Sequence, residues 1–162
     1  MVEAIRQLPA PFAYAPEQII RLPIQPPMAY TNWTEGDGNC QFRAFAMALD
    51  GGLTSHQEIR RRVIAGLREP EYSEHYVDRF AGPDDYQRYV SRMERDGEWG
   101  DDIALNMMGR LWRVNVAVLR PNGGGGFNWN KIYEEGEERF YLCLYFANNN
   151  HYENLILINE ED

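Results

Sequence analysis

The sequence predicts an α/β (α+β) domain in which a small mixed or antiparallel central sheet is flanked by helices. Apolar residues recur at helical spacing between residues 40 and 112, whereas apolar and polar residues alternate after Trp112. The 162 residues suffice for one domain, and their 44% hydrophobic and 25% charged residues are ordinary for a globular protein. Helices followed by strands favour a layered arrangement of this kind.

Residues 1–27 are predicted to form a proline-rich arm, and residues 28–162 form the folded domain. Six of the nine prolines precede Met28. Proline lacks an amide donor and disrupts helix interiors, so the arm should be extended or loop-like, apart from a short helix over residues 16–22. The arm either packs on the domain or reaches toward a substrate, and the sequence leaves both open.

Four helices are expected in the domain because each segment carries an apolar stripe. They cover residues 40–50, 55–69, 83–95 and 101–111. Asn39 is a candidate cap for the first helix, and Gly51 with Gly52 should end it. The aromatic residues expected in the core are Phe42, Phe45, Trp99 and Trp112.

Three strands are expected after the helices, over residues 114–118, 141–146 and 152–158. The four consecutive glycines at 123–126 lack a following Lys-Ser/Thr pair, so they are not a phosphate-binding loop. A hairpin loop between strands is the expected structure there.

Composition excludes several classes of function. A net charge of −9 disfavours duplex nucleic acid as a partner and favours a basic protein or peptide tail. No apolar stretch is long enough to span a membrane, and no signal peptide is visible, so we expect no membrane association. A cytoplasmic location is expected, or delivery to a host cytosol if the protein comes from a pathogen. No Cys/His set has the spacing of zinc ligands, so no metal or other cofactor is expected.

The two cysteines lie in different contexts. Cys143 lies in an apolar run that reads as a strand, where a thiol is usually a small buried hydrophobe. Cys40 follows Gly36 and Gly38 at the start of a predicted helix. A helix N-terminus can stabilise a thiolate, and glycines let several amides point into one small space, as an oxyanion hole requires. The same residues also fit an ordinary surface turn with a buried cysteine.

Three histidines are available as a general base. His56 and His75 lie in polar surroundings and are expected at the surface. His151 follows three asparagines and opens the last predicted strand, a junction at which catalytic side chains are often held. Any pairing of His151 with Cys40 would be tertiary, as is usual for Cys–His enzymes.

Three motifs together resemble those of the ovarian-tumour (OTU) deubiquitinases. Residues 35–44, Glu-Gly-Asp-Gly-Asn-Cys-Gln-Phe-Arg-Ala, resemble the cysteine motif of that family. Residues 97–101, Gly-Glu-Trp-Gly-Asp, resemble the stretch that opens a core helix, and His151-Tyr152 matches the family's histidine–aromatic pair. The resemblance extends over roughly residues 28–158 and implies an OTU-like cysteine protease fold.

The resemblance also implies roles for individual residues. Cys40 would attack the isopeptide carbonyl at the C-terminal glycine of ubiquitin or a ubiquitin-like modifier, and His151 would act as the base. Asp37 would brace the loop. Residues expected in the oxyanion hole are Gly38 and Asn39, together with the Cys40 amide. Residues expected to line the substrate channel are Trp33, Asn149 and Asn150.

The third catalytic group departs from the family pattern. Relatives usually carry Asn or Asp two residues after the histidine, whereas this chain has Glu153 and then Asn154. In a strand His151 and Glu153 share one face and Asn154 faces the other, which favours Glu153 as the group that orients the imidazole. Asn154 remains an alternative, and Glu153 could also be a surface carboxylate without a role.

The resulting prediction is a thiol-dependent deubiquitinase that acts as a monomer on ubiquitin or polyubiquitin. One alternative is a cysteine protease that acts on another peptide substrate. A second alternative, of a different class, is a non-catalytic ubiquitin-binding module of the same fold. The presence of both Cys40 and His151 argues against the module.

Overall fold

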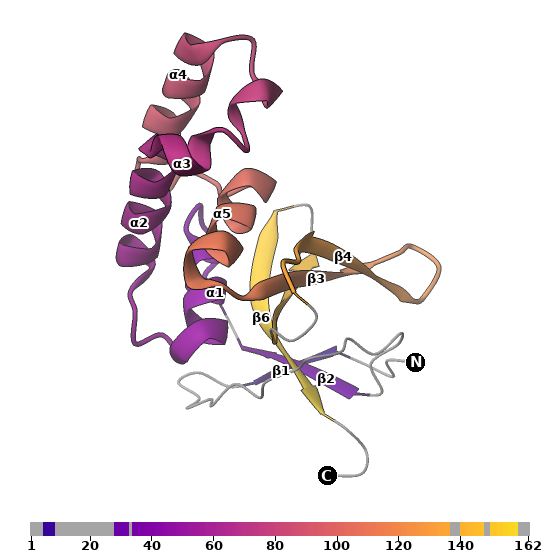
Figure 1. The fold of residues 1–162 in the computed structure, drawn as a ribbon. Helices are drawn as coiled ribbons and strands as arrows, with labels where there is room; N and C mark the ends of the chain where they lie inside the picture. Colours follow the sequence, from indigo (N-terminus) through magenta and orange to yellow (C-terminus); the bar gives the residue numbers. More distant parts are fainter. Residues whose placement is uncertain (1–4, 9–27, 33, 137–139, 148–149, 159–162) are drawn as a thin grey trace.

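Helices gather on one side of a six-stranded sheet (Figure 1). The structure is a computed structural model that describes residues 5–8, 28–32, 34–136, 140–147 and 150–158. Of the predicted arm, the described residues before Met28 are those of one strand, so the helix expected at residues 16–22 lies outside the described residues.

All four predicted helices are present. The helices and one 3-10 turn are α1 Cys40–Asp50, α2 His56–Arg68, α3 Pro70–Ser73, η1 Val77–Arg79, α4 Pro83–Met93 and α5 Asp102–Trp112. Gly51 ends α1 in the left-handed conformation, with φ of 72°. Ser55 caps α2 by accepting the Glu58 amide, and Asp101 caps α5 by accepting the Ala104 amide. The short segments α3 and η1 were not predicted.

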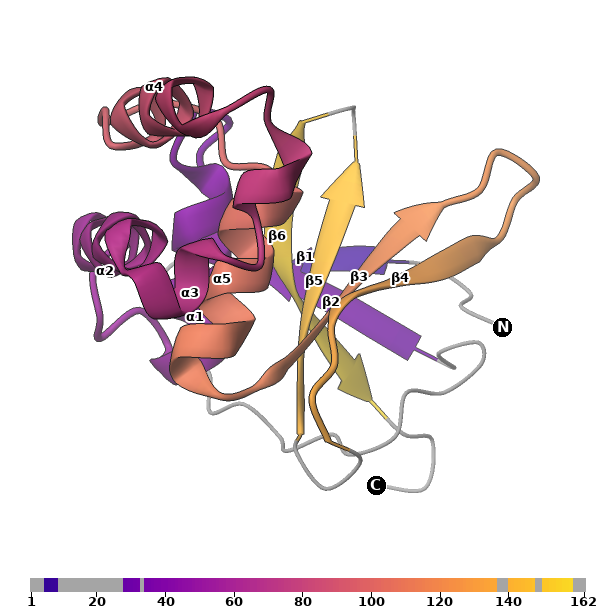
Figure 2. The same cartoon turned by 45° about the horizontal axis from the view of Figure 1, so that its top comes forward.

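The sheet is mixed, which confirms one of the two predicted forms. Its strands are β1 Ile5–Leu8, β2 Met28–Asn32, β3 Asn115–Pro121, β4 Phe127–Tyr133, β5 Tyr141–Ala147 and β6 His151–Ile158, in the order β1-β2-β6-β5-β3-β4. The pairs β1–β2 and β3–β5 are parallel, and the others are antiparallel. The β3–β4 hairpin extends away from the helices (Figure 2), and its tip is the glycine-rich segment expected there.

The core fills the space between the helices and one face of the sheet. Phe42 and Phe45 of α1 are fully buried, and Phe45 packs on Trp112 with ring centroids 5.5 Å apart. A second apolar cluster lies on the other face of the sheet and includes Cys143. The prediction of a buried Trp99 is wrong, because that side chain is 41% exposed just before α5 begins.

Helix α1 lies across strand β6 and thereby places its own N-terminus near the start of that strand. The strand pairs with β2 through Thr31 opposite Leu155 and with β5 through Ala147 opposite His151. Residues 34–39, which precede α1, therefore lie beside the beginning of β6. No helix in the described part of the chain has both the length and the apolar character that a bilayer span requires.

Candidate active site

The nucleophile loop, residues 34–39, ends at Cys40, the first residue of α1. The Cys40 side chain is 1% exposed, and its thiol donates to the carbonyl oxygen of Asn150 at 3.4 Å. This contact brings the cysteine to the residue directly before His151. Two segments far apart in the sequence thus meet where α1 and β6 both begin.

His151 lies between the nucleophile loop and a carboxylate. A Cβ atom placed on Gly36 would be 3.9 Å from His151 Nδ1, so this edge of the ring faces the loop. The other ring nitrogen, Nε2, lies 3.2 Å from Glu153 Oε2. The side chains of His151 and Glu153 are 23% and 11% exposed. An imidazole held in this way can carry a proton on the loop side while the carboxylate fixes its orientation.

The surroundings of Cys40 favour the protonated form of its thiol. Burial raises the pKa of this thiol, and the negative charge of Asp37 adds to the increase. Backbone hydrogen bonds from Tyr152, Gln41 and Cys40 itself act in the opposite direction without cancelling it. The thiol proton is directed at the Asn150 carbonyl, so attack on a substrate requires that this proton first move to a base.

Asp37 braces the nucleophile loop. Its carboxylate accepts the Asn39 amide at 3.0 Å and an Arg43 guanidinium N–H at 2.5 Å, and its carbonyl accepts the Cys40 amide at 3.2 Å. Burial alone would raise the pKa of Asp37, but the bonds from Arg43 and Asn39 outweigh it and hold that pKa below its ordinary value. The Asn39 amide is therefore engaged, whereas the Gly38 amide has no acceptor within the described residues.

The nucleophile loop packs against residues 93–98, which comprise the last residue of α4 and the loop after it and are termed the 93–98 loop. A Cβ atom on Gly38 would lie 1.5 Å from the Gly97 carbonyl oxygen, so only glycine allows this approach. Asn39 was expected to cap α1, but its side chain makes no cap hydrogen bond. It instead accepts the Gly97 amide at 3.0 Å and donates to Asp96 at 3.2 Å. The Asn39 side chain therefore links the nucleophile loop to the 93–98 loop instead of capping α1.

Arg60 of α2 is a component of the site region that the sequence analysis missed. It is 5% exposed, and its guanidinium donates to Asn39 Oδ1 and to the Gly38, Met93 and Glu98 carbonyls. A signal for it exists in the sequence, because Arg60 shares helical spacing with the buried residues Val63 and Ile64.

Glu153 and Asn154 lie on opposite faces of β6. Glu153 is paired with Tyr145, and Asn154 is paired with Leu144 of the main core. Asn154 is fully buried, and neither its Oδ1 nor its Nδ2 atom has a hydrogen-bond partner within the described residues. The strand register thus brings Glu153 to the imidazole and directs Asn154 away from it.

The remaining predicted site residues are described only in part. Trp33 and Asn149 lie outside the described residues, whereas Asn150 is described and contributes its carbonyl oxygen. His75 is exposed as expected, but His56 is half-buried beside Arg43, and its burial lowers its pKa. Among the described residues, no three His, Cys, Asp or Glu side chains are arranged to hold a metal ion.

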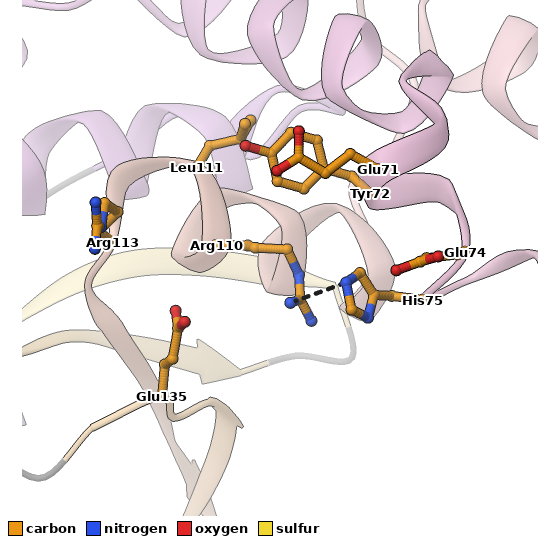
Figure 3. Close-up of a pocket in the computed structure, with 8 residues that line it drawn as sticks. All are labelled: Glu71, Tyr72, Glu74, His75, Arg110, Leu111, Arg113 and Glu135. Carbon is orange, nitrogen blue, oxygen red and sulfur yellow. Dashed lines mark hydrogen bonds between the residues drawn. The ribbon is translucent and has the colours of Figure 1, made fainter.

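A separate cavity of about 450 Å³ lies between α3, α5 and the segment after β4. Charges of both signs line it, including Glu71, Glu74 and Arg113, and Arg110 lies 3.4 Å from His75 Nε2 (Figure 3). It shares no residue with the site around Cys40.

Comparisons with known proteins agree with this geometry. The sequence profile of the family described as OTU-like cysteine protease matches residues 35–152. The OVARIAN TUMOR DOMAIN-containing deubiquitinating enzyme 10 of Arabidopsis thaliana is 39% identical over 85 residues, which are 52% of this chain and 22% of that protein. The chain spans between 22% and 36% of the length of three such plant relatives.

Solved structures share the fold. The OTU domain of OTUD1 has a TM-score of 0.67 at 22% identity and covers 79% of this chain and 85% of its own. The Hazara virus OTU bound to ubiquitin has a TM-score of 0.62 at 18% identity, with 81% and 82% covered. Since the profile match includes Cys40, Asp37 and His151 and spans most of the sequence, the chain belongs to the OTU-like cysteine protease family.

Proposed function

We propose that this chain is a thiol-dependent deubiquitinase domain that hydrolyses the isopeptide bond at the C-terminal glycine of ubiquitin. The proposal rests on one observation: the Cys40 thiol donates to the carbonyl oxygen of Asn150, directly before His151, and the His151 ring contacts Glu153 on its other side. Names of relatives support the substrate class, because several are deubiquitinating enzymes and two related structures hold ubiquitin. The acidic chain also suits a basic tail.

The reaction begins when His151 takes the thiol proton and the Cys40 sulfur attacks the isopeptide carbonyl. A C–S bond forms while the carbonyl π electrons move to oxygen. The Gly38 amide is suited to stabilise this oxyanion, because no acceptor within the described residues engages it. His151 returns the proton to the lysine nitrogen as the C–N bond breaks, which leaves a thioester on Cys40.

Water then completes the cycle. His151 removes a proton from water as its oxygen attacks the thioester carbonyl, and the sulfur leaves as the thiolate. Glu153 keeps the imidazole oriented through both steps and stabilises the imidazolium. The enzyme is proposed to act as a monomer.

A ubiquitin carrying an electrophile at its C-terminus tests the proposal. The wild-type chain should form a covalent adduct at Cys40, observed by mass spectrometry, and should cleave diubiquitin of at least one linkage. A chain that binds ubiquitin without forming the adduct would instead be a non-catalytic binding module. Adduct formation without diubiquitin cleavage, but with cleavage of other peptide bonds, would favour a protease of different substrate class.

The substrate channel is proposed to lie between the nucleophile loop and the segment before His151. Gly36 lies next to the His151 ring, and a Cβ atom on Gly36 would already be in van der Waals contact with it at 3.9 Å, which supports a narrow passage suited to glycine. A ubiquitin whose final glycine is replaced by a larger residue should be cleaved far more slowly. Equal cleavage of both forms would refute the narrow channel.

A further inference from the structure

Arg60 contacts the nucleophile loop on its buried side, away from bulk solvent. It is 5% exposed and lies on the buried face of α2 beside Ile59 and Val63. Burial lowers the pKa of its guanidinium, while the nearby carboxylates of Asp96 and Glu98 oppose that shift. A buried cation is costly unless its donors are satisfied. The two terminal nitrogens of Arg60 are hydrogen-bonded, whereas its Nε has no partner within the described residues.

The contacts of Arg60 converge on the two loops that meet at the site. Nη2 lies 2.7 Å from Asn39 Oδ1, 2.7 Å from the Glu98 carbonyl oxygen and 3.3 Å from the Gly38 carbonyl oxygen. Nη1 lies 2.7 Å from the Met93 carbonyl oxygen. The guanidinium carbon lies 4.0 Å from the centroid of the Phe42 ring in α1. One side chain thus joins the nucleophile loop, the 93–98 loop and helix α1.

The contact with Gly38 matters most for chemistry. The Gly38 carbonyl is directed toward Arg60, while the next amide, that of Asn39, is directed to the Asp37 carboxylate at 3.0 Å. The peptide unit between Gly38 and Asn39 is therefore hydrogen-bonded through both its carbonyl and its amide. Glycine permits many backbone conformations, so without such restraints the loop could rotate and carry the Gly38 amide away from the attacked carbonyl.

We propose that Arg60 is a positioning residue that fixes the nucleophile loop for stabilisation of the oxyanion. This inference rests on the proposed function. The fork of two nitrogens is essential to it, because a single ammonium group cannot reach Met93 on one side and Gly38, Asn39 and Glu98 on the other. Arg60 acts on the reaction through the loop and does not touch the substrate.

The test compares Arg60→Lys with Arg61→Lys, a matched change on the same helix. Arg61 is exposed and bonds to Glu58, away from both loops. A loop displaced by a fraction of an ångström should lower kcat for a fluorogenic ubiquitin substrate by about 10–100-fold, with KM changed less than about threefold. Arg61→Lys should leave both constants at their wild-type values.

Two further readouts separate positioning from general support of the fold. Ubiquitin aldehyde forms a tetrahedral adduct that uses the oxyanion hole, so its affinity relative to unmodified ubiquitin should fall in Arg60→Lys in proportion to kcat. Alkylation of Cys40 by iodoacetamide forms no oxyanion, so its rate should stay within about threefold of wild type.

Wild-type kcat in Arg60→Lys would overturn the inference. A uniform fall of all three readouts, matching a loss of folded protein by circular dichroism, would also overturn it. If Arg60→Lys does not fold, Asn39→Ala removes an acceptor of the same guanidinium and is judged by the same criteria. Failure of the wild-type chain to cleave ubiquitin would refute the proposed function itself, and it would be seen before any variant is compared.

Discussion

The two halves of the active site are held in different ways. The nucleophile loop is restrained from several sides, by the Asp37 carboxylate, by the Asn39 side chain and by the buried guanidinium of Arg60. The histidine half is a regular strand, in which His151 faces Glu153 through ordinary alternation. Next to it, Asn154 is buried with no hydrogen-bond partner among the described residues.

The difference follows from what each half must do. Backbone amides that stabilise an oxyanion act only from fixed positions, so a loop that supplies them needs many restraints. An imidazole needs one neighbour on each side; the strand provides Glu153 at a spacing of two residues, and the nucleophile loop provides the other. Substitutions in the loop should therefore affect stability and rate together, whereas those in the strand should act mainly on rate.

The largest expected effect is that of Cys40→Ala, which removes the sulfur at the meeting point of the two halves. Steady-state cleavage of a fluorogenic ubiquitin substrate should fall by more than about 10³-fold. The fold and the affinity for ubiquitin should persist, as measured by circular dichroism and calorimetry. Residual turnover of a few per cent would exclude Cys40 as the nucleophile.

Cys143→Ser is the control for this change. Cys143 is 3% exposed in β5, and burial raises its pKa to about 12, so its thiol is inert at neutral pH. The variant should keep kcat within about twofold and lose about 1–3 kcal/mol of unfolding free energy, because a hydroxyl replaces a buried apolar group.

Glu153→Ala should produce the next largest effect, and it tests whether changes in the strand that carries His151 act mainly on rate. It removes the carboxylate 3.2 Å from His151 Nε2, which orients the ring and stabilises the imidazolium. Single-turnover rates near neutral pH should fall by about 10–10³-fold with little change in KM, since orientation acts mainly on the transition state.

Asn154→Ala is the matched variant on the other face of the strand, and it should change kcat by less than about threefold. Its side chain lies opposite Leu144 in the main core and makes no contact that the imidazole needs. If Asn154→Ala proved more damaging than Glu153→Ala, the orienting bond would belong to Asn154 in the active enzyme.

Two glycine substitutions test the restraint on the loop. In Gly38→Ala the new Cβ would meet the Gly97 carbonyl oxygen at 1.5 Å, so the loops must separate. Overpacking of this kind should cost about 1–3 kcal/mol of unfolding free energy, measured by chemical denaturation. Gly36→Ala places its Cβ 3.9 Å from His151, an ordinary contact, and should cost less than about 0.5 kcal/mol. Equal costs would mean that the loops are not in close contact.

The helices could be predicted from the sequence because each has an apolar stripe and recognisable ends. Ser55 and Asp101 both cap as their positions suggest. Strands β1, β2 and β4 were missed for local reasons. The first has only four residues and ends directly before Pro9, β2 begins directly after Pro26 and Pro27, and β4 carries asparagines that strands usually avoid.

The residue types and motifs of the site could be predicted from the sequence, but the contacts between its residues could not. The roles of Cys40 and His151 follow from motifs, but their approach is a tertiary fact that no spacing reveals. The use of Asn39 as a link between loops, rather than as a helix cap, depends on the position of Gly97. Trp99 is apolar and was assigned to the core, yet it lies at the surface because the chain turns there before Asp101 begins α5.

The smallest expected effect concerns the charge of the resting thiol. Burial raises the pKa of Cys40, so the thiol stays protonated until the pH exceeds that raised value. In the free enzyme, alkylation by iodoacetamide should therefore increase about tenfold per pH unit through neutral pH, without an early plateau. The Cys143→Ser variant isolates the signal of Cys40.

The pH dependence of catalysis should differ from that of alkylation. Substrate must displace the thiol from the Asn150 carbonyl, after which His151 can accept the proton. The profile of kcat should then level off at a lower pH than the alkylation rate does. A thiolate–imidazolium pair formed before substrate arrives would instead give an alkylation plateau on the acid side of neutrality. That result would mean that the histidine strand contacts the sulfur in the free enzyme, and the two halves of the site would be assembled before substrate binds.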